Sequence, residues 1–397
     1  MDDIKRLHLS EIASLVTKGT TPTTIGYEFL DEGVNFLKIE CFDEYGNYIP
    51  NKVAHISKEC NEKLKRSQLE KGDILFSIAG AIGRVAIVTE EILPANTNQA
   101  LAIIRIDDEQ VYLPYISMIL TSPIVKRQFE RKKQGVAQLN ISLKDVNELE
   151  IPLPDRKQQI IYSELFAKIT EIIIYRKREL KMLDELIKAR FVEMFGDPEV
   201  NTKGWPIFEM CDLCSVSSSK RIYQSEQSSD GVPFLRISDL TNLINCGVTT
   251  ENLYIPEERY MELQAQGQVP IEGDILVTSR GTLGQCYIVK ADDRFYFQDG
   301  MISWLSEYAN GITPLYISYL FSMSGFRKQI DSMQAGSTVA YLSIAMIKKL
   351  KVMVPNAETQ RQFTTFVHQV DKLKSVIQEQ LKETQLLFDS LMQQYFG

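Results

Sequence analysis

A long internal repeat constrains the fold of this chain more than any other feature. The stretch "GDILFSIAGAIGRVAIV" at residues 72–88 returns as "GDILVTSRGTLGQCYIV" at residues 273–289, an offset of 201 residues. The same offset carries "FG" at 195–196 to "FG" at 396–397, with no gap between. Solenoid units are about 20–45 residues long. A repeat of this length therefore indicates a duplicated pair of domains.

Each copy begins with a segment of mixed secondary structure. The short runs "VNFLKI" (34–39), "DILFSI" (73–78) and "VAIV" (85–88) are rich in β-branched residues and predict strands. Residues 112–132 have apolar side chains at helical spacing and predict one helix. Residues 143–154 predict a short helix followed by a strand that ends at prolines. The mixed segments are therefore expected to be α+β.

A long stretch free of Gly and Pro follows each mixed segment. In residues 156–195, apolar side chains recur every three or four positions, and the C-terminal stretch repeats this pattern. A helix of about 38 residues is about 57 Å long, far beyond the usual 10–14 residues. We therefore expect the two helices to pair lengthwise, antiparallel because the linkers are short. The residues predicted at this interface, or at a partner interface, are Leu165, Ile169, Ile172, Leu183 and Leu186 in the first helix, and Phe366, Val370, Leu373, Ile377 and Leu387 in the second.

The predicted domain organisation follows the repeat. We expect a first α+β domain at 1–154, a first long helix at 155–197, a second α+β domain at 198–355 and a second long helix at 356–397. The two α+β domains are expected to be related by an approximate twofold axis.

The composition narrows the class of protein. Hydrophobic residues make up 44% of the chain and no apolar run approaches the roughly 20 residues that span a membrane. The start of the sequence has no secretion signal, so we expect a cytoplasmic location. The six cysteines are scattered, and Cys211 and Cys214 form a single C-x-x-C without further metal ligands nearby, so we expect this pair to be plain buried cysteines and expect no metal site.

No motif indicates catalysis. The chain has no Walker A loop, no Gly-x-Gly cofactor turn and no Asn-Pro-Pro-aromatic tetrapeptide of adenine methyltransferases. Asp73 and Asp274 each follow a Gly before a strand, where a turn that accepts backbone N–H groups is the simpler interpretation than metal chemistry. We therefore expect neither catalytic residues nor cofactors.

The polar loops diverge where the rest of the sequence repeats. Two similar but different domains at a fixed spacing suit a long ligand read at two places, and duplex DNA is such a ligand. Arg and Lys suit guanine, Asn and Gln suit adenine, and hydroxyls or Gly-rich backbone suit phosphates. The predicted DNA-binding residues are Lys18, Thr20, Thr21, Ser77, Arg84, Asn98, Gln99, Lys133, Gln134, Gln138 and Asn140 in the first copy, and Ser219, Lys220, Arg221, Tyr223, Ser279, Arg280, Thr282, Gln285, Gln298, Ser337, Thr338 and Tyr341 in the second.

The layout, with "GDILFSIAGAIGRVAIV", "GVAQLNIS", "IPLPDRKQQ" and "KARFVEMFGDP", resembles the specificity subunit of type I restriction–modification systems over essentially the whole chain. The resemblance implies two target recognition domains, each binding one half of a split, asymmetric DNA site. It implies helices that set the spacing and dock two methyltransferase subunits, joined by restriction–translocase subunits. The family commonly has Glu-Gln after the proline before each helix, where this chain has Gln158–Gln159 and Thr359–Gln360.

The charge of the chain leaves two other interpretations open. The net charge is −8, which argues against tight non-specific phosphate binding by this chain alone. If methyltransferase subunits carry much of the phosphate contact, the recognition subunit need not be basic. The alternatives are a recognition subunit for a fused nuclease–methyltransferase and a two-headed protein-binding scaffold, which the negative charge favours.

Overall fold

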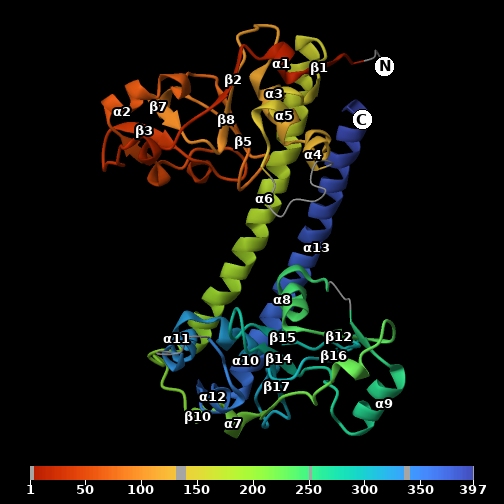
Figure 1. Ribbon diagram of the computed structural model, residues 1–397. Coiled ribbons are helices and arrows are strands. Elements are labelled where there is room, and N and C mark those ends of the chain that lie inside the picture. Colours follow the sequence, from red (N-terminus) through yellow and green to blue (C-terminus); the bar gives the residue numbers. More distant parts are fainter. Residues whose placement is uncertain (1–3, 131–139, 250–252, 335–339, 397) are drawn as a thin grey trace. The chain divides into compact units, whose positions relative to one another are not determined.

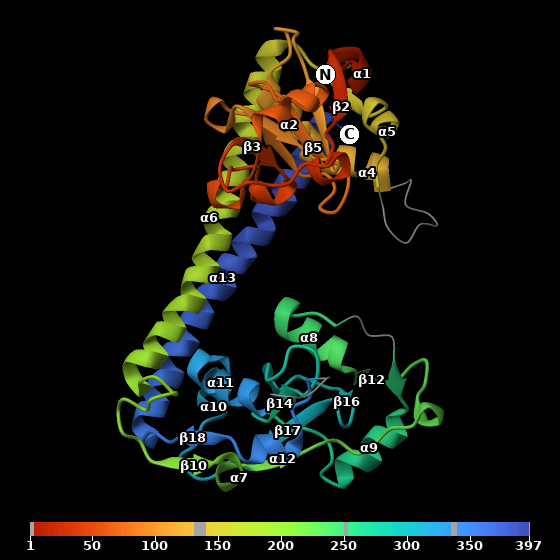
Figure 2. The same ribbon diagram turned by 60° about the vertical axis from the view of Figure 1, so that its left-hand side comes forward.

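The computed structural model describes residues 4–130, 140–249, 253–334 and 340–396, which form two compact units. The first unit combines Met1–Lys177 with Gln378–Gly397, and the second is Arg178–Ile377. The two long helices, α6 (Arg156–Phe195) and α13 (Ala357–Phe396), each contribute to both units. Figures 1 and 2 show the elements of each unit.

The first unit contains a four-stranded sheet in the order β2-β8-β5-β6, a three-stranded sheet β4-β3-β7 and the pair β1-β9. All neighbouring strands are antiparallel except β3 and β7, which are parallel. The strands are β1 (Arg6–His8), β2 (Leu15–Lys18), β3 (Val34–Leu37), β4 (Ala54–Ile56), β5 (Ile74–Ser77), β6 (Val85–Ile87), β7 (Ala95–Thr97), β8 (Leu101–Arg105) and β9 (Glu150–Pro152). The helices before α6 are α1 (Leu9–Ile12), α2 (Lys58–Lys63), α3 (Leu113–Thr121), α4 (Pro123–Glu130) and α5 (Leu143–Asn147), with short 3-10 turns between some of them.

The second unit repeats this plan with sheets β11-β17-β14-β15 and β13-β12-β16 and the pair β10-β18. Its strands are β10 (Ile207–Glu209), β11 (Ser215–Ser217), β12 (Val232–Leu235), β13 (Tyr254–Ile255), β14 (Ile275–Thr278), β15 (Cys286–Ile288), β16 (Tyr296–Phe297), β17 (Ile302–Ser306) and β18 (Lys351–Met353). Its helices are α7 (Met210–Leu213), α8 (Ile237–Cys246), α9 (Glu257–Ala265), α10 (Pro314–Ser322), α11 (Ser324–Met333) and α12 (Ile344–Lys348). The predicted duplication of an α+β domain is confirmed.

The four-stranded sheet of each unit is covered on both faces, which explains its unbroken apolar strands. Successive side chains of a strand point to opposite faces. In β5, Ile74 and Phe76 join the core with α3 and α6, whereas Leu75 joins a second cluster on the other face. In β14, Ile275 and Leu276 divide between two clusters in the same way. Figure 1 shows the three-stranded sheet of the first unit (β3, β4 and β7, orange) on the far side of the four-stranded sheet from α6.

Within each unit the start of one long helix packs against the end of the other. In the first unit, the ring centroids of Tyr162 and Tyr395 lie 4.8 Å apart, and those of Phe166 and Phe388 lie 5.2 Å apart. In the second unit, the aromatic pair is Phe191 with Phe363, at 5.5 Å. The helices therefore run antiparallel in each unit, as their apolar spacing and short linkers predicted.

One expected helix is divided in two. The spacing predicted a single helix over 112–132, but α3 ends at Thr121 and α4 begins at Pro123. Ser122, between them, has an extended backbone with φ −71° and ψ 157°. A residue before proline is pushed out of the helical region by the proline ring. The single-helix prediction was therefore wrong because Pro123 outweighs the apolar spacing.

The two copies diverge most between the third strand of the repeat and the next. Strand β3 is followed by a three-residue 3-10 turn, Ile39–Cys41, whereas the matching strand β12 is followed by the ten-residue helix α8. In α8, Leu240 is buried, and Leu243 and Ile244 pack against the same cluster at helical spacing. The second unit thus has a helix beside its small sheet that the first unit replaces with a turn and a loop.

Candidate nucleic-acid interface

Four of the predicted loops meet at one end of the four-stranded sheet in the first unit. This end is where β2 and β5 finish and β8 begins. The amide of Gly19 donates to the Asn98 carbonyl at 3.2 Å, and the amide of Ile78 donates to the Ala100 carbonyl at 2.9 Å. The amide of Ile141 donates in turn to the Ile78 carbonyl at 2.9 Å. We name this surface the first loop edge: residues 18–21, 77–84, 97–100 and 140–141.

The second unit builds the same edge from the matching loops. Ser279 donates its amide to the Met301 carbonyl at 2.9 Å and accepts the Leu342 amide at 3.0 Å, the counterparts of two bonds in the first unit. The hydroxyl of Ser219 donates to the Phe297 carbonyl at 2.7 Å and joins the loop after β11 to the same end. The second loop edge comprises residues 218–221, 278–285, 297–301 and 340–342.

A glycine makes the first loop edge compact. A Cβ atom on Gly19 would lie 1.8 Å from the carbonyl oxygen of Thr97. This approach is closer than any side chain permits, so the chain after β2 passes against β7 only because residue 19 has no side chain.

Most of the predicted DNA-binding residues lie on the two loop edges. In the first unit, Gln99 and Asn140 are exposed, and Lys18, Thr20, Thr21, Arg84 and Asn98 are partly exposed. In the second unit, Lys220, Arg221, Arg280 and Thr282 are exposed, and Gln285, Gln298 and Tyr341 are partly exposed. Tyr223 is exposed just beyond the second edge. Lys133, Gln134, Gln138, Ser337 and Thr338 lie outside the described residues. That these residues bind DNA stays a prediction.

Three predicted serines are buried at the foot of the edges. Ser77 donates its hydroxyl to the Ala79 carbonyl at 3.0 Å, and the hydroxyls of Ser279 and Ser303 lie 2.9 Å apart. Ser219, bonded to Phe297, is also buried. Their polar atoms are satisfied within the protein, so they support the loops from beneath. A direct contact of these hydroxyls with a ligand has no support in this geometry.

The exposed cations of the second loop edge differ in how they are held. The Nε of Arg221 donates to Asp299 Oδ2 at 2.9 Å, which raises the pKa of Arg221. The ammonium of Lys220 donates to Gln266 Oε1 at 3.2 Å. The guanidinium carbon of Arg280 lies 5.3 Å from the centre of the Tyr341 ring. The edge therefore presents three cations with three different partners, of which one is a carboxylate.

Sequence reasoning missed the polar partners of these residues. Asp299, Gln266 and Asn245 were not predicted, yet each hydrogen-bonds a predicted residue, and Asn245 Oδ1 accepts from Gln285 Nε2 at 3.3 Å. Asn245 lies on α8, whose apolar spacing was visible in the sequence. The pairings were not, because their members are 40 to 78 residues apart in the chain.

The two matched aspartates hold turns beneath the sheets. Asp73 Oδ2 accepts the Glu70 amide at 2.8 Å, and Asp274 Oδ2 accepts the Ile271 amide at 2.9 Å. The expected turn role is confirmed at both sites. Their further partners differ: Arg105 donates to both oxygens of Asp73 at 2.8 Å, whereas Trp304 Nε1 donates to Asp274 at 2.8 Å. Burial raises the pKa of Asp274.

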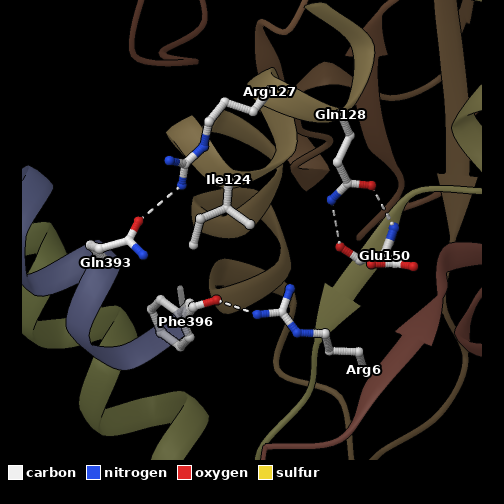
Figure 3. A pocket seen from close by; sticks show the side chains of 7 residues that line it. All are labelled: Arg6, Ile124, Arg127, Gln128, Glu150, Gln393 and Phe396. Atoms are coloured by element: carbon white, nitrogen blue, oxygen red, sulfur yellow. Dashed lines mark hydrogen bonds between the residues drawn. The ribbon is translucent and has the colours of Figure 1, made fainter. Parts of the chain in front are cut away.

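A cavity of about 260 Å³ in the first unit lies between α4, β1, β9 and the end of α13 (Figure 3). Its arginines are engaged: Arg6 donates to the Phe396 carbonyl at 2.7 Å and Arg127 to Gln393 Oε1 at 3.2 Å. Gln128 exchanges two hydrogen bonds with the backbone of Glu150, both at 2.9 Å. The second unit has a cavity at the matching place, lined by Lys328, Gln329 and Lys351 among others. The two cavities lie at matching places, and their arginine, lysine and glutamine side chains are hydrogen-bonded within the protein. We therefore interpret both as gaps between packed elements of the repeated fold.

Metal and membrane sites are not found in the described parts of the chain. Within residues 4–130, 140–249, 253–334 and 340–396, no three His, Cys, Asp or Glu side chains are grouped to hold a metal ion. None of the helices described is long and apolar enough to cross a membrane. Cys211 is exposed and Cys214 is buried, so the prediction of plain buried cysteines was wrong for Cys211. Cys211 lies in the first turn of α7, whose apolar residues Met210 and Leu213 face the core instead.

The predicted interface residues of the long helices fall into two groups. Ile169 and Val370 are buried, and Leu165, Leu183 and Phe366 are partly buried against the cores of their units, while Ile377 is partly buried without belonging to a core cluster. The exposed group is Ile172, Leu186, Leu373 and Leu387, with 46–56% of each side chain accessible. The first group stabilises the helix pairing within the units. The second group does not, and remains the candidate for a partner interface.

The fold and the two loop edges define a duplicated α+β protein with two similar but diverged polar surfaces beside antiparallel helices. The model of the type I restriction modification DNA specificity domain matches it twice, over residues 1–182 and 202–384. The chain belongs to this family, and the resemblance stated from its repeat is confirmed.

Several curated relatives are specificity subunits. A 148-residue segment is 32% identical to the EcoBI specificity subunit of Escherichia coli and covers 37% of this chain and 30% of that one. A 176-residue segment is 24% identical to a putative type I specificity subunit of Haemophilus influenzae, covering 44% and 42%. The aligned part of this chain thus spans less than half the length of these two relatives.

Two solved structures share the fold along nearly the full chain. One comes from work on complex assembly and conformational transition of the type I restriction–modification system. It has a TM-score of 0.57 at 16% identity and covers 98% of this chain and 96% of that one. The other is a type I S subunit from M. genitalium, with a TM-score of 0.51 at 16% identity, covering 100% and 97%. These likenesses agree with the repeated architecture described above.

Proposed function

We propose that this chain is the DNA-recognition subunit of a type I restriction–modification complex, and that each loop edge reads one half of a bipartite, asymmetric site. The observation that carries the proposal is the pair of loop edges. Their backbone bonds match through Ile78 and Ser279, while their exposed side chains differ. Two domains that recognise different half-sites need the same backbone support and different exposed side chains. The chain itself contributes recognition and no catalysis.

The side chains of the edges suit the chemistry of DNA. The first edge offers Asn98, Gln99 and Asn140 with Lys18 and Arg84, and amide side chains pair well with adenine. The second edge offers Lys220, Arg221 and Arg280, and cations suit guanine or phosphate. The two edges are therefore expected to prefer different bases. We place the border of each reader at the long helices, near residues 154 and 355.

The long helices are proposed to set the spacing of the half-sites and to dock two methyltransferase subunits, with restriction–translocase subunits joining them. Exposed apolar side chains support this role. On α6 in the first unit, Ile161, Ile172 and Tyr175 are 46–60% exposed, and on α13 in the second unit, Leu373 and Val376 are 53–56% exposed. Exposed apolar side chains that adjoin one another mark a partner surface, whereas single ones are ordinary.

The net charge of −8 leads to a first test. Because phosphate contacts dominate affinity for DNA, we expect this chain alone to bind a duplex weakly and to bind it far better with its methyltransferase. The measurement is a gel-shift titration of a site-containing duplex with and without the partner. Equal affinity in the two titrations would contradict the shared-contact arrangement.

The decisive experiment maps methylated adenines in cells with and without this gene and its neighbours. The proposal expects a split sequence motif that disappears when the gene is deleted. Replacing residues 1–154 by the first domain of another family member should change one half-site only. Inserting a helical turn in α6 and α13 should change the gap and leave both half-sites intact.

The outcomes also separate the alternatives. Absence of any gene-dependent motif would favour a two-headed protein-binding scaffold. A motif that depends on a single neighbouring gene encoding both nuclease and methyltransferase would identify a fused partner enzyme. A domain exchange that altered both half-sites would overturn the assignment of one reader to each unit.

A further inference from the structure

Two neighbouring pairs of positions change together between the loop edges. The buried pair Ser279 and Ser303 stands where the first unit has Ile78 and Ala102. The surface pair Arg280 and Tyr341 stands where the first unit has Ala79 and Asn140. The offset is 201 residues in all four cases, so these are the same sites in the repeated frame.

The backbone beneath Arg280 is held in place. Ser279, the residue before it, is 1% exposed and is bonded through its amide, its carbonyl and its hydroxyl, the last at 2.9 Å from the Ser303 hydroxyl. A residue bonded at all three groups has little freedom to move. Arg280 therefore leaves the sheet from a fixed point.

The backbone that carries the ring beneath the guanidinium is also held in place. Gln334 Oε1 accepts the amide of Tyr341 at 2.8 Å, and Gln334 Nε2 donates to the Tyr341 carbonyl at 3.1 Å. The next residue, Leu342, is fully buried and bonded to Ser279. The 5.3 Å contact between the Arg280 guanidinium and the Tyr341 ring therefore joins two anchored residues. Such a contact orients the planar guanidinium before a ligand arrives.

The same unit contains a second Arg–Tyr pair, in which the arginine also forms an ion pair. Arg294 also lies 5.3 Å from a tyrosine ring, that of Tyr260, but its guanidinium forms an ion pair with Glu257. Among the described residues, no carboxylate forms an ion pair with Arg280, although Arg221 on the same edge is paired with Asp299. Arg280 thus presents a stacked guanidinium whose charge the surrounding side chains leave available to a ligand.

We propose that Arg280, oriented by Tyr341, reads a guanine in the half-site of the second unit, and that Ser279 and Ser303 position it. Guanine offers O6 and N7 on its major-groove edge, and the guanidinium fork matches both acceptors at once. The first unit has Ala79 and Asn140 at these positions and lacks this element. The proposal rests on the proposed function, and it names the base that the second loop edge selects.

The test uses the complete complex in cells with its methyltransferase, and reads the methylated motif of each variant. Arg280→Ala should make one position of one half-site degenerate, with guanine preference there reduced about tenfold to a hundredfold, and should leave the other half-site unchanged. Arg280→Lys keeps the charge and loses the fork, so it should relax the same position. Tyr341→Ala should relax it in part, whereas Tyr341→Phe keeps the ring and should retain it.

Arg294→Ala is the matched control, because it removes an arginine from a pair of the same geometry away from the edge. It should leave the motif unchanged. Hydrogen exchange of β14 and β17 in each variant shows whether the second unit is folded, and the conservative Lys and Phe variants keep the test informative if an alanine variant is not.

Several outcomes would overturn the inference. They are a wild-type motif with no G·C pair in the affected half-site, uniform weakening by Arg280→Ala with an unchanged motif, and full guanine preference in Arg280→Lys. Uniform weakening would identify a phosphate contact instead. These outcomes are distinct from failure of the proposed function, in which the wild-type chain itself yields no gene-dependent motif.

Discussion

The two units hold the same frame with the same bonds but differ at the surfaces that the frame supports. Tyr115 and Tyr316 each donate their buried hydroxyl to a carbonyl of the following β-strand, both at 2.5 Å. Gln159 and Gln360 are buried at the start of α6 and α13, where Gln159 bonds to three backbone groups and Gln360 to two. On the loop edges, by contrast, Ala79 and Asn140 stand against Arg280 and Tyr341.

The difference shows where a duplicated domain is free to change. A side chain that satisfies buried backbone groups has no substitute, because an unpaired buried N–H or carbonyl costs about 1–3 kcal/mol. An exposed side chain at a loop has water as an alternative partner and is replaced at little cost to stability. Divergence between the units is therefore tolerated best on exposed loops.

A buried carboxylate that is kept in both units, but with different partners, gives the largest expected contrast. Asp73 is paired with Arg105, whose side chain is 20% exposed, whereas Asp274 accepts from Trp304 and has no ion pair with any described residue. Asp73→Asn leaves a largely buried guanidinium without its main partner, and should destabilise the first unit by about 2–4 kcal/mol. Asp274→Asn keeps an oxygen for Trp304 and Ile271, and should cost the second unit less than about 1 kcal/mol.

Hydrogen exchange measured by mass spectrometry on β5 and β8 against β14 and β17 checks this contrast, since it reports each unit separately. Each variant serves as the control for the other. Equal losses of protection would show that the two carboxylates contribute equally to the stability of their units despite their different partners.

The glutamines at the helix starts should behave alike. Gln159→Ala leaves the Tyr112 amide and the Gln110 and Pro154 carbonyls without this partner. Gln360→Ala does the same to the amide and hydroxyl of Thr313 and to the Pro355 carbonyl. We expect each change to cost its own unit about 2 kcal/mol. The measurement is hydrogen exchange at α3 for Gln159→Ala and at α10 for Gln360→Ala. A loss of protection in only one of the two variants would show that the two helix junctions are not equivalent.

The buried tyrosine hydroxyls provide a smaller test of the same equivalence. Tyr115→Phe and Tyr316→Phe each remove one hydrogen bond to a carbonyl and keep the ring, so each should cost about 1 kcal/mol. Thermal unfolding of the two variants should shift by similar amounts. A shift in one variant of more than twice that in the other would break the comparison.

The smallest effect concerns pH. Burial raises the pKa of Asp274, so the protonated form is favoured in the folded second unit. This contribution to stability is complete below the ordinary aspartate value of about 3.9 and is lost as the pH rises through the raised pKa. The stability of wild type minus that of Asp274→Asn should therefore fall over this range and then stay constant. A difference that rises with pH would mean that Asp274 is held as an anion.

Many of the strands and helices were predictable because they depend on local sequence patterns. The apolar run "DILFSI" indicated a strand, and the apolar spacing after residue 156 indicated a long helix. The break at Ser122 was also a local feature, because a residue before proline is disfavoured in a helix. The prediction of one helix gave more weight to the helical spacing of the apolar residues on both sides of Pro123. Helix α8 was missed because its pattern has no counterpart in the other copy.

The candidate site was predictable only as a set of loops. Ser279 was predicted as a surface residue because it adjoins Arg280 in a polar turn, yet it is buried. Its neighbour in space is Ser303, 24 residues away, and the two hydroxyls satisfy each other. No local pattern distinguishes a serine that faces a ligand from one that supports the loop from beneath.

The sequence by itself determined that this chain is a duplicated α+β protein with paired long helices, because the repeat and the periodicity of apolar residues are properties of chain order. Only the tertiary structure decided which residues form a site. Arg280 and Tyr341 are far apart in sequence, and meet because the amide of Leu342 bonds to the carbonyl of Ser279 and ties two loops together. Burial and pairing arise from contacts between distant segments, and those contacts exist only in the folded protein.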